Sequence, residues 1–173
     1  MDIIIRKALL EDAYDYAACH VSCWLSAYKG IVSDDFLDSM PVEIERRTER
    51  YRQAFTVPDN CEYYCVIYAE RMIGFLFISK SSDEDKPLAG EVVAIYLLEG
   101  YWGRGYGRKM MDYAVEKLRH IGHNEIILWT FEKNDRARRF YEKYGFSFDG
   151  TKKEMTNWGG PLSLVRYVLN ISN

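Results

Sequence analysis

The segment from Leu98 to Arg108, which reads LEGYWGRGYGR, constrains the fold of this chain more than any other feature. It follows an apolar run over residues 92–98 that predicts a strand, and it opens an amphipathic stretch that predicts a helix. Glycines let the backbone approach an anion closely, and the free N–H groups at a helix start point toward that anion. The segment therefore predicts a strand, a turn and a helix arranged around a phosphate group.

Two common phosphate-binding loops do not fit this segment. A P-loop requires Lys and then Ser or Thr after its last glycine, but Gly107 is followed by Arg108 and Lys109. A dinucleotide-binding fingerprint requires G-x-G-x-x-G in a first β-α-β unit, whereas this segment reads G-x-G-x-G after four predicted strands. On the spacing alone, a turn without any ligand remains an alternative.

The order of the predicted elements limits the architecture. Apolar periodicity and turn residues predict strands at 3–6, 61–69, 72–80, 91–98, 125–131, 146–149 and 162–170, and helices at 11–28, 42–55, 105–119 and 135–144. A run of antiparallel strands thus precedes a single β-α-β-α stretch. This order favours an α/β (α+β) fold with one mixed, mostly antiparallel sheet that carries helices on both faces.

Size and charge exclude several classes of protein. At 173 residues the chain is long enough for a core of its own, so we expect a single domain over residues 1–173. The formal net charge of −3 argues against binding of nucleic acid. Apolar runs such as 72–78 are too short to span a bilayer, and residues 1–6 lack a signal-peptide pattern. We therefore expect a cytoplasmic protein that does not bind a membrane.

The four cysteines predict free thiols. Cys19 and Cys23 share one helix face, whereas Cys61 and Cys65 lie about 13 Å apart along a strand, too far for one tetrahedral metal site. Nothing in their spacing suggests a secreted disulfide framework, and we expect no bound metal.

A second block narrows the choice of ligand, because residues 134–146 read NDRARRFYEKYGF. Together with the glycine segment, this block resembles the GNAT superfamily of acetyl-CoA-dependent N-acyltransferases, whose patterns are Gln/Arg-x-x-Gly-x-Gly/Ala and N-x-x-A-x-x-F/L-Y-x-x-x-G-F. The second pattern is matched at Asn134, Ala137, Phe140, Tyr141, Gly145 and Phe146. The first is matched at Gly105 and Gly107, but Trp102 stands where Gln or Arg is usual. The resemblance covers nearly the whole chain.

The resemblance implies a donor site in the middle of the sheet. In the family, the strand before the glycine segment splays from its neighbour, often at a β-bulge, and the gap receives the pantetheine arm of acetyl-CoA. By position, Ile95, Tyr96 and Leu97 would offer backbone groups to that arm, and the Leu97 N–H would polarise the thioester oxygen. The implied cofactor-binding set is completed by Gly103, Arg104, Gly105, Tyr106, Gly107, Arg108 and Asn134. Simple solubility is the alternative role for the two arginines, and helix capping is the alternative for Asn134.

Two residues are candidates for proton transfer. Tyr141 matches the general acid of the family, since a phenol can give a proton to a departing thiolate; packing in the core is its alternative role. Glu91 stands at a position matching the catalytic glutamate of the family's histone-acetylating branch. Strand alternation places Glu91 on the same face as residues 93, 95 and 97, where apolar neighbours would raise its pKa and suit it to be a general base. The alternative is an exposed carboxylate at the strand start, with water carrying the proton.

The resemblance implies direct transfer of an acetyl group from acetyl-CoA to a primary amine. The acceptor would be a small-molecule or peptide amine held by aromatic side chains, with core packing as their alternative role. The candidates are Trp24, Tyr28, Phe36, Trp129 and Trp158. The net negative charge favours a cationic acceptor, and a homodimer would be in keeping with the relatives. Two alternatives stay open: a non-catalytic acyl-CoA-binding sensor or regulatory domain, and a nucleotide-binding module outside this family.

Overall fold

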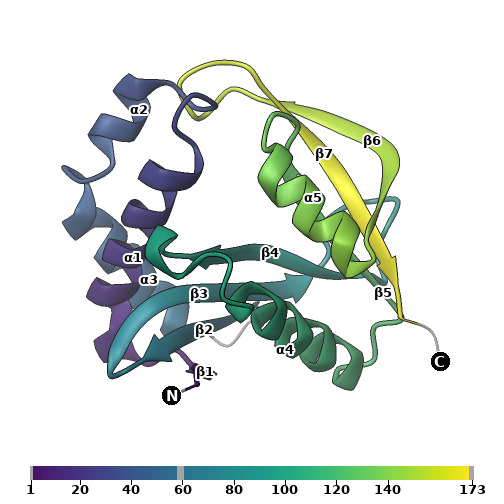
Figure 1. Cartoon of the computed structure of the whole chain (residues 1–173), viewed down its shortest axis with the longest axis horizontal. Coiled ribbons are helices and arrows are strands. Elements are labelled where there is room, and N and C mark those ends of the chain that lie inside the picture. The colour runs from purple at the N-terminus through teal and green to yellow at the C-terminus, as the bar shows by residue number, and fades with distance from the viewer. Residues whose placement is uncertain (1, 58–60, 172–173) are drawn as a thin grey trace.

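The structure is a computed structural model that describes residues 2–57 and 61–171. Within these residues, seven strands form one sheet that has helices on both sides (Figure 1). The strands are β1 Ile4–Lys7, β2 Cys61–Tyr68, β3 Arg71–Lys80, β4 Gly90–Leu97, β5 Glu125–Phe131, β6 Ser147–Met155 and β7 Leu162–Asn170. The helices are α1 Ala13–Ala27, α2 Asp34–Ser39, α3 Ile44–Thr56, α4 Tyr106–His120 and α5 Asp135–Tyr144, with short 3₁₀ helices η1 Leu10–Asp12 and η2 Glu99–Tyr101.

The strands are arranged in the order β1-β2-β3-β4-β5-β7-β6. Every neighbouring pair is antiparallel except β4 and β5, which run parallel. The parallel pair arises because the chain crosses from β4 to β5 through α4, and such a crossover needs a long connection. The predicted mixed, mostly antiparallel sheet with helices on both faces is confirmed.

Apolar side chains form separate cores on the two faces of the sheet. On one face, α4 and α5 cover a core that includes Met110, Met111 and Leu118. On the other face, α1, α2 and α3 cover two smaller clusters rich in aromatic rings, one around Trp24 and one around Tyr16. Figure 1 shows the same division, with α4 and α5 together and α1 to α3 grouped apart from them. Each fully buried side chain of this kind stabilises the fold by about 1.5–3 kcal/mol, so both helical layers are firmly attached to the sheet.

The centre of the sheet is open. β4 pairs with β5 only at its first two residues, Gly90 and Glu91, and the two strands then part. Beyond that point β4 continues along β3, and β5 continues along β7, so each strand keeps one neighbour. At Val93 the register between β3 and β4 shifts, which marks a β-bulge. The expected splay of the central strands is therefore confirmed.

Two elements differ from the sequence-based expectation. The sequence analysis does not predict α2, although Ser33 is a favourable N-cap and its hydroxyl accepts a hydrogen bond from the Phe36 N–H at 3.3 Å. β6 extends to Met155 instead of ending at residue 149. Its residues are mostly exposed and its register with β7 shifts, so no apolar alternation marks its full length. Both segments border one of two cavities in the middle of the molecule.

Candidate active site

Two cavities in the described part of the chain lie on either side of the opening between β4 and β5. The glycine-loop cavity, of about 620 Å³, is bordered by residues that include Ile95, Leu97, Gly103, Gly105, Gly107, Asn134 and Tyr141. The aromatic cavity, of about 520 Å³, is bordered by residues that include His20, Trp24, Tyr51, Phe75, Glu91 and Trp158. Some residues border both cavities, among them Tyr28, Ala94, Tyr96 and Trp129. The two cavities therefore meet where the central strands part.

Glycines shape the loop between β4 and α4. Gly103 and Gly105 have φ values of +74° and +82°, a left-handed backbone that glycine adopts without strain. A side chain at either position would meet no atom within 4 Å, so the space over the loop is open. Gly105 is the N-cap of α4, and the first N–H groups of a helix have no partners within it. The wall of the glycine-loop cavity thus offers a helix start suited to an anion.

Trp102 occupies the position where the resemblance implies Gln or Arg. Its Nε1 donates a hydrogen bond to the Leu97 carbonyl at 2.6 Å, which ties the end of β4 to the loop. The Arg136 guanidinium of α5 lies over the indole ring, 3.0 Å from its centroid. Both side chains border the glycine-loop cavity. Arg136 therefore brings a cation to this cavity that the sequence does not predict, because the pattern N-x-x-A leaves its position unspecified.

Of the other cofactor-binding residues predicted in the loop, one side chain borders the cavity and two do not. Arg108 borders the glycine-loop cavity, and its guanidinium lies 5.3 Å from the centroid of the Tyr144 ring. Arg104 instead lies over the Tyr101 ring, and the Tyr106 ring packs against β2. Arg104 and Tyr106 are thus outside the cavity wall, and their contact with a cofactor stays a prediction.

The open edge of β4 presents backbone groups. Leu98 donates its N–H to a carbonyl of β3 at 2.8 Å, and successive residues of a strand direct their N–H groups to opposite edges. Leu97 and Ile95 therefore direct their N–H groups toward the opening, whereas the backbone of Tyr96 pairs with β3. Tyr96 contributes its side chain instead, because its hydroxyl is hydrogen-bonded to that of Tyr28 at the border of both cavities.

α5 places Tyr141 and Asn134 on the wall of the glycine-loop cavity. Tyr141 is 8% exposed, and burial raises the pKa of its hydroxyl above the ordinary value. A phenol in this setting keeps its proton at neutral pH, which suits a proton donor and not a base. Asn134 caps the helix, since its Oδ1 accepts a hydrogen bond from the Ala137 N–H at 3.2 Å. Its capping role is confirmed, and the same residue reaches the cavity.

Glu91 does not lie on the face that strand alternation predicts. The β-bulge at Val93 adds one residue to β4, so Glu91 falls on the same face as Tyr96. The prediction that it shares a face with residues 95 and 97 is wrong for this reason. Glu91 borders the aromatic cavity instead, where burial raises its pKa. A carboxylate in that position can accept a proton from an amine held in the cavity.

Two other titratable groups on the aromatic cavity, His20 and Tyr28, are each held in one protonation state near pH 7. His20 Nδ1 and the Tyr51 hydroxyl are hydrogen-bonded at 2.6 Å. Burial, helped by two arginines of α3, lowers the pKa of His20 to about 3, so this imidazole is neutral. Burial raises the pKa of Tyr28 to about 12. Among these groups, Glu91 is therefore the one best suited to take up a proton.

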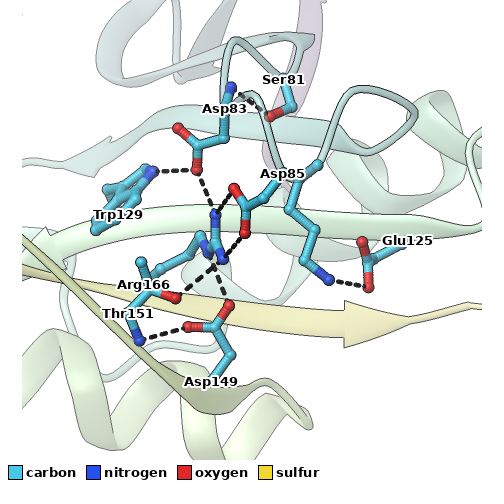
Figure 2. Close-up of polar contacts among 9 residues, drawn as sticks. Ser81, Asp83, Asp85, Glu125, Trp129, Asp149, Thr151 and Arg166 are labelled. Atoms are coloured by element: carbon cyan, nitrogen blue, oxygen red, sulfur yellow. Dashed lines mark hydrogen bonds and ion pairs between the residues drawn. The ribbon is translucent and has the colours of Figure 1, made fainter.

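A buried arginine holds the loop that leads into β4. Arg166 of β7 is 2% exposed and donates hydrogen bonds to Asp83 at 2.8 Å and to Asp85 at 2.7 Å (Figure 2). It also donates to Asp149 of β6 at 2.7 Å. Asp83 accepts a further hydrogen bond from Trp129 Nε1 at 3.1 Å. Because Trp129 borders both cavities, this Arg166 cluster positions one wall of the site from outside it.

Cys19, Cys23 and Cys65 are present as thiols, and the Sγ atoms of Cys19 and Cys23 lie 4.0 Å apart. Across residues 2–57 and 61–171, no three His, Cys, Asp or Glu side chains are grouped so that they could hold a metal ion. No helix in the described ranges is long and apolar enough to cross a membrane.

Comparison with known proteins relates this arrangement to a family. The model of the acetyltransferase (GNAT) family matches residues 29–146. The uncharacterized N-acetyltransferase YuaI of Bacillus subtilis is 27% identical over 97% of this chain and 99% of its own length. The uncharacterized N-acetyltransferase Mb2688 of Mycobacterium bovis is 33% identical over 83% of this chain and 88% of its own. The crystal structure of the PaiA N-acetyltransferase of Thermoplasma acidophilum in complex with coenzyme A has a similar fold, with a TM-score of 0.78 and 19% identity over 98% of this chain and 99% of that one.

Proposed function

The chain belongs to the acetyltransferase (GNAT) family and is an acyltransferase, and on this premise we propose that it moves an acetyl group from acetyl-CoA directly to a primary amine. The observation that carries the proposal is the meeting of two cavities at the opening between β4 and β5. Direct transfer requires a thioester and an amine to meet at one carbon, and two cavities with a common border allow this. We treat residues 1–173 as one acyltransferase domain, with a small-molecule or peptide amine as its acceptor.

Acetyl-CoA fits the glycine-loop cavity. The open backbone at Gly103 and Gly105 and the start of α4 would bind the pyrophosphate, and Arg108 and Arg136 would add positive charge. The pantetheine arm would lie along the free edge of β4, where the Leu97 N–H points into the opening. The complex of the PaiA relative with coenzyme A supports this choice of donor.

The reaction forms a bond between the amine nitrogen and the thioester carbonyl carbon and breaks the bond between that carbon and sulfur. Glu91 would take a proton from the amine, directly or through water, on the aromatic side of the opening. The Leu97 N–H would stabilise the negative charge that develops on the carbonyl oxygen. Tyr141 would give its proton to the departing thiolate on the other side. The protein would thus hold both substrates in line and supply one base, one N–H donor and one acid.

Release of free CoA from acetyl-CoA, measured with a thiol reagent across a panel of primary amines, tests this proposal. We expect thiol release that depends on the amine, with one equivalent of acetylated amine found by mass spectrometry. Acetyl-CoA should also raise the melting temperature, since a hundredfold excess over Kd adds about 2.7 kcal/mol of stability. Binding of acetyl-CoA without turnover of any amine would identify a sensor instead, and absence of a thermal shift would contradict the donor site.

A further inference from the structure

The aromatic cavity carries more positive charge than the whole chain suggests. Its charged border residues are Arg47 and Arg50 of α3, Lys153 of β6 and Glu91 of β4. Three cations therefore border this cavity against one carboxylate, although the net charge of the chain is −3. The expectation of a cationic acceptor, drawn from the net charge, does not agree with the charges that an acceptor would meet in this cavity.

Arg47 is the least exposed of the three cations. Its side chain is 14% exposed, and its ion pair with Glu43, the N-cap residue of α3, is long at 3.9 Å. Its Nε atom is buried and has no hydrogen-bond acceptor among residues 2–57 and 61–171. A largely buried guanidinium costs stability when its donors are left without acceptors. The position of Arg47 is therefore unfavourable for the fold alone, and an anion in the cavity would offset that cost.

Two other buried donors, those of Arg166 and Trp24, can be compared with the unpaired donor of Arg47. The guanidinium of Arg166 is also buried, but three aspartates satisfy it, as a structural role requires (Figure 2). Trp24 is 8% exposed, and its Nε1 is buried without an acceptor in the described ranges. Within those ranges, the buried side-chain donors that lack an acceptor are those of Arg47 and Trp24, and both residues border the aromatic cavity.

We propose that the acceptor is a small primary amine that also carries an anionic group, a carboxylate or a phosphonate, and that Arg47 binds this group. This rests on the proposed acetyl transfer and names the substrate class of the same site. The amine lies toward Glu91 and the opening between β4 and β5, and the anion lies toward α3. Rings such as Phe75 and Trp158 contact the part of the molecule between them. Arg50, which is exposed, adds positive charge on the same helix.

Size and charge both favour this class of acceptor. A cavity of about 520 Å³ is in the range that holds small molecules. A polyamine, which carries several positive charges, would be repelled by the cations that border the cavity. An arginine binds a carboxylate or a phosphonate through paired N–H donors, which fixes the orientation of the amine relative to the opening.

Isothermal titration calorimetry on the full chain with saturating CoA tests the charge preference. The probes are phenylalanine and leucine with their amides, 2-aminoethylphosphonate with ethylamine, and spermidine. We expect at least one amine that carries an anionic group to bind roughly ten- to a hundredfold more tightly than its counterpart without that group, as the loss of a charge-assisted hydrogen bond implies. The amino acids and the aminophosphonate then distinguish a carboxylate from a phosphonate. Equal binding within every pair, or tighter binding of spermidine, would overturn the proposal.

Arg47→Gln tests whether Arg47 binds the anionic group of the acceptor, and Arg52→Gln is the matched control. Both changes remove one positive charge from α3, but Arg52 is 53% exposed and does not border the cavity. We expect Arg47→Gln to raise the KM for the amine with the anionic group roughly ten- to a hundredfold, with little change for the counterpart that lacks this group. Arg52→Gln should leave both KM values unchanged. Equal losses for both kinds of amine in Arg47→Gln, or no loss, would overturn the role of Arg47.

The two proposals fail in different ways. Acetyl transfer only to amines without an anionic group would overturn the substrate class and leave the acetyltransferase proposal intact. Absence of acetyl transfer to every amine would overturn the proposed function, whereas the calorimetric comparison of each pair would still decide the charge preference of the cavity.

Discussion

The two cavities are built in different ways. The glycine-loop cavity draws mainly on two continuous segments, residues 92–110 and residues 134–144, and much of its proposed phosphate binding comes from backbone N–H groups. The aromatic cavity draws on side chains from α1, α2, α3, β3, β4, β5, β6 and β7, which are far apart in the sequence. A donor site made of backbone leaves a compact signature in the sequence, and an acceptor site made of scattered side chains does not.

The two cavities also differ in which features of the chain their proposed ligands require. Backbone binding of a phosphate depends on glycine conformation and on the start of a helix, so we expect the proposed donor site not to require Gln or Arg in place of Trp102. Recognition of an amine depends on the identity of individual side chains. Changes on one side of the opening should therefore affect donor binding and leave acceptor binding intact, and the reverse should hold for the other side.

The largest effect, a fall in kcat, is expected for a change beside the opening between β4 and β5. Tyr141→Phe removes the proposed acid, so kcat should fall by about 10²–10⁴-fold while the Kd for acetyl-CoA stays nearly constant. Stopped-flow or steady-state rates with a calorimetric Kd would measure both quantities. Tyr113→Phe, which removes a hydroxyl from α4 outside both cavities, is the control. Unchanged kcat in Tyr141→Phe would remove this residue from catalysis.

The second largest effect is expected for a change at Arg166, which should lower the stability of the fold and weaken binding of the amine. Arg166→Met leaves three aspartates without their cation and should lower the free energy of unfolding by about 3–5 kcal/mol. Because Trp129 is held through Asp83, the KM for the amine should rise more than the Kd for acetyl-CoA. Urea unfolding measures the first effect, with Arg71→Met on the exposed end of β3 as the control.

The loss of stability in Arg166→Met should depend on pH. The hydrogen bond from Arg166 holds the pKa of Asp85 below its ordinary value. The stability that this provides is present above about pH 4, the unfolded pKa of an aspartate, and is lost as the pH falls through the lowered folded pKa. The gap in stability between the wild type and Arg166→Met should therefore narrow on acidification. A gap that stays constant down to pH 2 would show that the carboxylates do not carry the effect.

A smaller effect is expected for a change in the glycine loop, which should weaken binding of acetyl-CoA alone. Gly105→Ala places a residue with a side chain at φ +82°, which costs about 1–2 kcal/mol, so the Kd for acetyl-CoA should rise about tenfold. The KM for the amine should change little. Gly100→Ala adds the same methyl group where the φ is not left-handed and nothing lies within 4 Å, so it should bind acetyl-CoA normally. Equal losses in both variants would argue against the left-handed turn as the binding element.

The smallest effect is expected for Glu91→Gln, because water can carry the proton in its place. The rate should fall by less than about tenfold, well below the roughly hundredfold loss of a dedicated base. Burial raises the pKa of Glu91, and the ionised form is the base, so wild-type kcat/KM should rise with pH through a pKa above the ordinary glutamate value. The variant should lack this rise. The same pH profile in both proteins would exclude Glu91 as the base.

The sequence predicts the fold well, and it also predicts which residues border the glycine-loop cavity. β5, β7 and α5 have the predicted bounds, because buried runs and capping residues such as Asn134 and Gly145 mark them clearly. The glycine loop and Tyr141 lie on one cavity, as the resemblance implies. These features are local, so residues close in the sequence are enough to define them.

The acceptor side depends on tertiary structure and could not be predicted in the same way. The bulge at Val93, which moves Glu91 to the other face of β4, leaves no mark in an apolar strand. Arg47 reads as one of several charges on an amphipathic helix until α3 is packed against α1. Arg136 becomes a cavity residue only because Trp102 lies beneath it.

A crystal structure of the full chain with CoA tests the central claim most directly, namely that donor and acceptor approach the opening from opposite sides. The account predicts the pyrophosphate on the loop from Gly103 to Arg108 and the thiol sulfur at the opening between β4 and β5, beside Leu97 and Tyr141. The aromatic cavity should remain free for the amine. CoA bound in the aromatic cavity, or a sulfur atom placed away from the opening, would contradict the account.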